Sequence, residues 1–232
     1  TAYEIRLSLV GSEMCIRDRG KRALSKGYDQ INHEVFVSGA QLCDYYTCEI
    51  YPTNRGRFAQ VIDRKVDYPA EFGYGLVTNK WLLETFSGRI GLIGANTKMN
   101  IIQNLMEAPQ YQDYLGLEKF EDYISLPQKF ACDDIDATEQ MVAEQLKNST
   151  SKIFLMGMGH VKSGLIHRLK KHANAVFLDV GASIDALAGI IDVNRPFAGD
   201  WTNYQIDEPE LYNDVDFLAY EGQGKHITLS RE

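Results

Sequence analysis

The feature that most constrains this chain is a strand–glycine turn–helix–strand pattern over residues 152–195. A short apolar run at 152–156 leads into a turn with two glycines at 157–160, and the next segment, 161–172, has apolar residues at helical spacing. A second apolar run at 175–180 ends in another glycine turn. Buried strands that alternate with helices in this way pair in parallel. The pattern therefore predicts part of an α/β domain that holds a nucleotide-like ligand.

The same alternation extends on both sides of this unit. Apolar runs predict further strands at 35–37, 89–94 and 123–126. Apolar residues at helical spacing predict helices at 81–86, 99–106, 133–146 and 184–191. Because strands and helices take turns along the chain, we expect an α/β fold with a Rossmann-like parallel sheet and helices on both faces.

Charge and cysteine content exclude several classes of protein. A net charge of −8 is unfavourable for non-specific binding to nucleic acid, which needs clustered Lys and Arg to neutralise phosphates. A basic cluster at 168–172 ends a predicted helix, where it complements the helix dipole. The four cysteines form no CxxC pair and have no histidine at zinc spacing, so we expect free thiols in the reducing cytoplasm. No apolar run approaches the roughly 18 residues of a membrane-spanning helix.

Residues 1–19 do not read as a secretory signal, because acidic residues interrupt the apolar positions. The stretch 9–19 resembles the translation of a transposon-type sequencing-library adapter, which indicates adapter sequence read through in a metagenomic assembly. We therefore expect residues 1–19 to lie outside the fold and the natural N-terminus to be missing. The remainder, 20–232, is expected to form a single α/β domain, with a nucleotide-binding half at 88–200.

Three glycine-bearing turns directly follow predicted strands. In an open parallel sheet, ligands bind outside the carboxyl ends of the strands. Glycine lets the backbone approach a ligand, and the next helix offers free N–H groups to a phosphate. We expect the nucleotide to be bound by residues of these turns and of the loop that follows, namely Gly94, Asn96, Gly157, Gly159, His160, Asp179, Gly181, Ser183, Asp185 and Arg195.

Each polar member of this set also has a structural explanation. The match to GxGxxG is incomplete, because Lys162 stands at the third glycine position. His160 could contact a phosphate or sugar, or cap the helix. Asp179 could hold a ribose hydroxyl pair or cap the following helix. Asp185 lies in a first helical turn, where a dipole role is favoured, and Arg195 is a candidate anion partner or a surface ion pair.

The glycine pair after 153–156, the run 176–181 and Asp185 together resemble the C-terminal part of the GT-D-type glycosyltransferases, a family long catalogued as a domain of unknown function. Arg195, with the Gly-Ile pair at 189–190, resembles a pattern in related polysaccharide-biosynthesis proteins. The resemblance implies transfer of a sugar from a nucleotide-sugar donor, a UDP-sugar, to a glycan or lipid-linked acceptor. It also implies that helix N-termini, a cation or a divalent metal stabilise the departing diphosphate.

The chain departs from the family pattern at two places. Ala182 stands where the family has a histidine. The family's N-terminal Arg…Gly-Asp-Gly-Glu-like segment has no counterpart, since Asp44 and Glu49 are wrongly spaced. The catalytic residues are therefore left unassigned, and we expect the missing motif to have been lost with the natural N-terminus.

Two other functions stay open. The run 178–182 superficially matches the Asp-x-Gly-x-Gly motif of S-adenosylmethionine-dependent methyltransferases, although Ser183 occupies the place of the second glycine and other strands precede it. The chain could also be a non-catalytic, nucleotide-binding relic of the fold, in keeping with the absent acidic motif.

Overall fold

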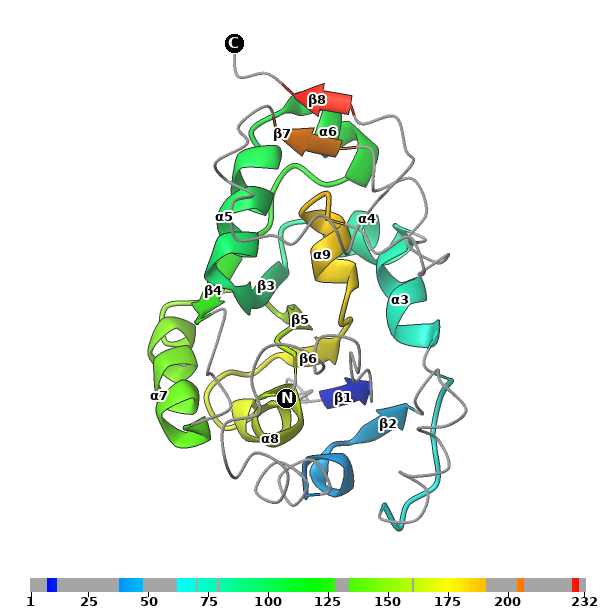
Figure 1. Cartoon of the computed structure of the whole chain (residues 1–232), viewed down its shortest axis with the longest axis vertical. Helices are drawn as coiled ribbons and strands as arrows, with labels where there is room; N and C mark the ends of the chain where they lie inside the picture. The colour runs from blue at the N-terminus through cyan, green and yellow to red at the C-terminus, as the bar shows by residue number, and fades with distance from the viewer. Residues whose placement is uncertain are drawn as a thin grey trace, which may run out of the picture.

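The computed structural model describes residues 8–11, 38–47, 62–69, 71–78, 80–127, 134–159, 161–190, 204–206 and 227–229 (Figure 1). The predicted strand at 35–37 lies outside these segments, as do His160 and Arg195. The short segment 38–42 is helical and precedes the second strand.

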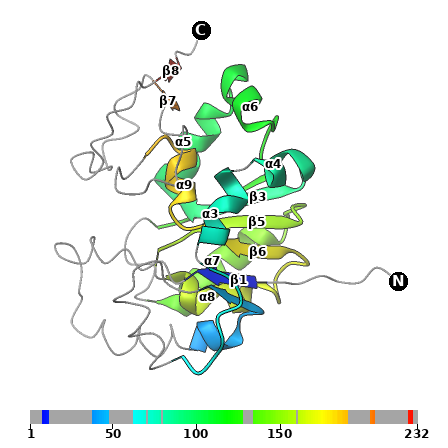
Figure 2. The same ribbon diagram turned by 90° about the vertical axis from the view of Figure 1, so that its right-hand side faces the viewer.

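A six-stranded, wholly parallel sheet forms the centre of the molecule, in the order β2-β1-β6-β5-β3-β4. Figure 2 shows β3, β5, β6 and β1 one beneath the other in this order. The strands are β1 (Ser8–Gly11), β2 (Tyr45–Thr47), β3 (Ile90–Ala95), β4 (Asp122–Leu126), β5 (Ile153–Gly157) and β6 (Val176–Asp179). A separate parallel pair consists of β7 (Tyr204–Ile206) and β8 (Ile227–Leu229).

Helices cover both faces of the sheet, which confirms the predicted Rossmann-like α/β fold. On one face, Leu92 and Leu155 pack among residues of α4, α5 and α9. On the other face, Ile93 and Phe154 pack among residues of α7 and α8. Successive residues of a buried strand thus supply two separate cores. The helices are α3 (Glu71–Thr78), α4 (Trp81–Thr85), α5 (Asn96–Leu105), α6 (Pro109–Leu115), α7 (Ile135–Leu146), α8 (Val161–Leu169) and α9 (Ser183–Leu187).

The connections between strands change direction at β3 and β5. From β3 the chain passes through α5 and α6 to β4 on one side, whereas β5 leads through α8 to β6 on the other side. The helices α5 and α8 pack on opposite faces of the sheet. The carboxyl ends of β3 and β5 therefore flank a topological switch point, which is where open α/β sheets bind their ligands.

Within the stretch 1–19, residues Ser8–Gly11 form strand β1 of the sheet. Leu9 is in register with both Tyr45 and Leu178, so β1 lies between β2 and β6. The apolar pair Leu9 and Val10 suits a buried strand, and the unpaired backbone of β6 offers it hydrogen bonds. The similarity of this stretch to adapter sequence concerns its origin and stays a prediction.

Helix α9 is shorter than predicted. It ends at Leu187 rather than near 191, because Gly189 adopts a left-handed conformation with φ of 72°. The backbone N–H of Ile190 donates to the carbonyl of Asp185 over 2.9 Å, which closes the helix end. The sequence showed an apolar run but not the turn that interrupts it.

Helix α6 was not predicted at all. Its residues are mostly polar and aromatic, so the apolar periodicity is carried only by Tyr111 and Leu115, which are buried. Pro109 begins the helix, and Gly116 ends it with φ of 67°. The Tyr111 hydroxyl donates to the Leu187 carbonyl over 2.5 Å and ties α6 to α9.

Candidate functional site

The three predicted turns lie together at the carboxyl edge of the sheet. β3, β5 and β6 are adjacent and parallel, with Gly94 in register with Gly157 and Met156 in register with Asp179. The first residues of α5 and α9 follow directly. The structure thus gathers at one edge the predicted residues that it describes, namely Gly94, Asn96, Gly157, Gly159, Asp179, Gly181, Ser183 and Asp185.

Two of the glycines make room for side chains of α5 and α9 rather than for open space. A Cβ on Gly157 would lie 2.6 Å from Ile184 Cγ1 and 2.7 Å from the Gly181 carbonyl oxygen. A Cβ on Gly94 would lie 2.9 Å from Met99 Cε. Distances this short exclude any side chain without movement of the neighbours, so Ile184 fills the space above both strands. A ligand at this edge must therefore lie further out, along the turns themselves.

Gly159 is the open part of the turn after β5. It is exposed, its φ is 59°, and no atom of the described residues lies within 4 Å of the position that its Cβ would occupy. Only glycine adopts this backbone conformation without strain, and the open space lets another molecule approach the main chain. This arrangement agrees with the residue type that a phosphate-binding turn requires.

Asp179 forms a buried ion pair with Lys162, the residue that breaks the GxGxxG pattern. Lys162 Nζ lies 2.6 Å from Asp179 Oδ2, and the two side chains are only 3% and 1% exposed. The other carboxylate oxygen of Asp179 accepts a hydrogen bond from the Gly181 backbone N–H over 3.1 Å. Both oxygens are thus engaged within the protein, in an ion pair and a turn rather than in the helix cap that the sequence suggested, since the N-cap residue of α9 is Ala182. Ser183, the first residue of α9, is also buried.

Lys98 is a residue that the sequence did not single out, and it pairs with Asp185 at this edge. The pair joins the first turns of α5 and α9, and its two side chains are about one-fifth exposed. A lysine in a first helical turn is disfavoured by the helix dipole, so it needs a compensating anion. This unfavourable position, close after Gly94, is the feature of the sequence from which Lys98 could have been identified.

The N-terminus of α5 has features that suit an anion. Its first turn contains no acidic residue, and its N-cap residue, Ala95, has no side chain that could accept hydrogen bonds from the first N–H groups. Asn96, the first helical residue, is exposed. A phosphate at this helix end would meet backbone N–H groups and the ammonium group of Lys98.

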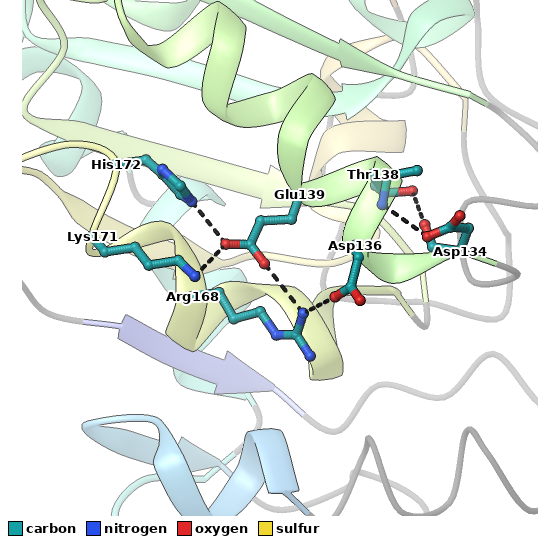
Figure 3. Close-up of polar contacts among 8 residues, drawn as sticks. Asp134, Asp136, Thr138, Glu139, Arg168, Lys171 and His172 are labelled. Atoms are coloured by element: carbon teal, nitrogen blue, oxygen red, sulfur yellow. Dashed lines mark hydrogen bonds and ion pairs between the residues drawn. The ribbon is translucent and has the colours of Figure 1, made fainter.

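A second charged cluster lies at the other end of α8 and has a structural role (Figure 3). Glu139 of α7 contacts Lys171 Nζ at 2.7 Å, His172 Nε2 at 2.8 Å and Arg168 Nη1 at 3.2 Å. Burial opposes the ionisation of Glu139, but the hydrogen bonds from these three partners outweigh it and lower its pKa from 4.5 to about 2. Arg168 also contacts Asp136 at 2.6 Å. The basic tract therefore joins α8 to α7, beyond the dipole role expected from the sequence.

The divalent metal that the resemblance implies finds no ligand set in the described segments. No three His, Cys, Asp or Glu side chains gather there closely enough to hold an ion. The cysteine that these segments include, Cys43, is buried, and its thiol donates to the Ala40 carbonyl over 3.2 Å. No helix among them is both long and apolar enough to cross a membrane.

Comparison with known proteins gives this chain no relative. No protein-family model, no curated protein and no solved structure matches it.

Proposed function

We propose that the protein binds the diphosphate of a nucleotide-sugar donor, a UDP-sugar, at the carboxyl edge of the sheet and transfers the sugar to a glycan or lipid-linked acceptor. One observation carries the proposal: the carboxyl ends of β3 and β5 lie side by side at the topological switch point, with Gly94 in register with Gly157. Open α/β sheets bind nucleotides at this position.

Lys98 is the residue proposed to contact the diphosphate. In the structure its ammonium group faces the Asp185 carboxylate, and both side chains are partly open to solvent. A diphosphate at the α5 N-terminus would replace the Asp185 carboxylate as the partner of Lys98. The backbone N–H groups of Asn96 and its neighbours would donate to the same phosphate oxygens.

The same contacts suit the chemistry of sugar transfer. The bond between the anomeric carbon and the diphosphate oxygen breaks, and a bond from the anomeric carbon to an acceptor hydroxyl oxygen forms. The departing diphosphate gains negative charge as this happens, and the acceptor hydroxyl loses its proton. A lysine and fixed N–H groups at the diphosphate stabilise that charge most in the transition state. The base that takes the proton is left unassigned.

Calorimetry with UDP and UDP-glucose on the full chain tests the proposal. We expect saturable binding by the unmodified protein and at least about tenfold weaker binding by the Lys98→Gln variant. Lys147→Gln is the matched control, because Lys147 also pairs with a carboxylate, Glu144, but lies at the C-terminal end of α7. Absence of binding at millimolar ligand by folded protein, or equal weakening in both variants, would overturn the proposal.

The strand order does not favour the methyltransferase alternative. In that class the Asp-x-Gly-x-Gly motif follows the first strand of the domain. Here the run 178–182 comprises the end of β6 and the turn after it, and within the described residues β6 is the last strand along the chain to join the six-stranded sheet. S-adenosylmethionine is therefore included in the calorimetry as a ligand that we expect not to bind.

A further inference from the structure

Three exposed aromatic side chains form a continuous surface, which we call the aromatic platform: Tyr45, Tyr68 and Phe72. The ring centroids of Tyr45 and Tyr68 are 5.6 Å apart, and those of Tyr68 and Phe72 are 4.8 Å apart with nearly parallel planes. The three residues are 38%, 38% and 41% exposed. Exposed apolar side chains that lie in contact mark an interaction site, whereas single exposed ones are common on any protein surface.

The aromatic platform lies at the same edge of the sheet as the proposed donor site. Tyr68 forms a parallel bridge with Thr47, the last residue of β2. Phe72 precedes Gly73, whose missing Cβ would lie 3.0 Å from the carbonyl oxygen of Asp179 at the end of β6. In Figure 1 the arrows of β1 and β2 point toward the side on which α3 lies. The platform therefore adjoins the carboxyl end of β6, next to the turns described above.

The charged residues of the segment 63–67, which leads into Tyr68, sum to zero. Residues 63–67 contain two acids and two bases, namely Asp63, Arg64, Lys65 and Asp67. The carboxylate of Asp67 uses one oxygen, Oδ2, to accept from Arg64 Nη2 at 2.9 Å and from the Tyr46 backbone N–H at 2.7 Å. Within the described part of the chain, its other oxygen has no hydrogen-bond partner, and the side chain is 33% exposed. A partly exposed carboxylate oxygen of the residue that precedes Tyr68 is thus available to accept a hydrogen bond.

We propose that the aromatic platform binds the pyranose ring of an uncharged glycan, the acceptor of the transfer reaction; this rests on the proposed function. A pyranose ring carries polarised C–H groups on one face and hydroxyls around its rim. The C–H face packs on the electron-rich faces of aromatic rings, and a rim hydroxyl donates to Asp67 Oδ1. A polyanion, such as nucleic acid or an acidic lipid surface, would instead require a basic surrounding, which residues 63–67 do not provide.

Saturation-transfer NMR on the full chain tests this proposal. The probes are methyl β-glucoside, methyl β-galactoside and methyl N-acetyl-β-glucosaminide, with uridine for comparison. We expect saturation of the C–H protons of at least one glycoside, reduced at least about tenfold in titrations of Tyr68→Ala and of Phe72→Ser. Trp81→Ala is the matched control, because Trp81 is 58% exposed on α4 but outside the platform. Circular dichroism confirms that each variant is folded.

Three results would overturn the proposal: no saturation of any glycoside, saturation of uridine alone, or equal loss in the Trp81→Ala variant. Sedimentation provides a further decisive measurement, because a dimer that dissociates on Tyr68→Ala would identify a second copy of the chain as the occupant. Separate measurements of glycoside binding and of UDP binding distinguish this proposal from the proposed function. Glycoside binding without UDP binding leaves the platform standing and overturns the donor site, whereas UDP binding without glycoside binding does the reverse.

Discussion

At the scale of single residues, the least replaceable interaction is the buried pair of Lys162 and Asp179. Each charge lost most of its hydration on folding, so each depends on the other. We expect Lys162→Met to lower the free energy of unfolding by about 3–5 kcal/mol, because it leaves an unpaired buried carboxylate. Chemical denaturation measures this loss.

The double variant Lys162→Met/Asp179→Asn is the control for that prediction. Asparagine removes the unpaired charge and keeps an oxygen that accepts from the Gly181 N–H. We expect the double variant to be more stable than Lys162→Met alone. A double variant that is less stable than the single one would show that the pair itself is not what stabilises this turn.

The lowered pKa of Glu139 indicates how acid affects the stability of the protein. A carboxyl whose folded pKa is about 2 and whose ordinary value is 4.5 adds stability above pH 4.5 and loses it as the pH falls toward 2. We expect Glu139→Gln to cost about 2 kcal/mol at pH 7 and much less near pH 2. Asp122, whose pKa is also lowered by hydrogen bonds from Ser149 and Ser151 in spite of its burial, contributes to the same acid transition. Urea denaturation of the unmodified protein and of Glu139→Gln across this pH range measures the contribution of Glu139 as the difference between their free energies of unfolding.

At the scale of elements, β4 is an edge strand whose backbone is paired by a side chain. The Gln145 amide of α7 accepts from the Ser125 N–H over 2.9 Å and donates to the Ser125 carbonyl over 2.8 Å. A helix side chain thus occupies hydrogen-bonding positions that a neighbouring strand would otherwise use. Edge strands left open in this way pair with other chains.

We expect Gln145→Leu to cost about 1–3 kcal/mol, because the two partly buried backbone groups of Ser125 lose their partners. Hydrogen exchange at the Ser125 amide should become faster, and light scattering on heating should begin at a lower temperature. Gln140→Leu is the matched control, since Gln140 is an exposed residue of the same helix. Equal behaviour of the two variants would contradict a protective role of Gln145.

The elements that could be predicted from the sequence are strands buried on both faces and a helix with a clear N-terminal cap. β3 and β5 consist almost entirely of buried apolar residues, and α7 begins with Asp134 as a side-chain cap, so their patterns were unambiguous. Helix α6 and strand β2 were not predicted, since each depends on neighbours distant in the chain rather than on its own periodicity.

For the candidate site, the sequence predicted that three glycine-bearing segments meet at one edge of the sheet. It did not predict the ion pairs of Lys98 with Asp185 and of Lys162 with Asp179, because these partners lie 87 and 17 positions away in the sequence.

At the scale of the whole molecule, the N-terminal strand tests two opposing expectations about residues 1–19. If β1 belongs to the fold, its removal separates β2 from β6. We expect a chain that begins at residue 20 to lose at least about 1–2 kcal/mol, a fall in melting temperature of about 2–8 °C. A chain that begins at residue 8 keeps β1 and is the control. Unchanged melting of the shorter chain would show that these residues add nothing, in keeping with an adapter origin.

The place of β1 also sets the order in which the molecule can be completed as it is synthesised. Ser8 is in register with Phe177, so about 170 residues must leave the ribosome before the first strand meets this partner. At roughly 5–20 residues per second this takes roughly 10–30 s. During that time β3, β4 and β5, which are neighbours in the sheet, can already assemble. Among the strands of the six-stranded sheet, the seam between β1 and β6 is then the last to close, so β1 stays open to other nascent chains on this side until β6 has been made.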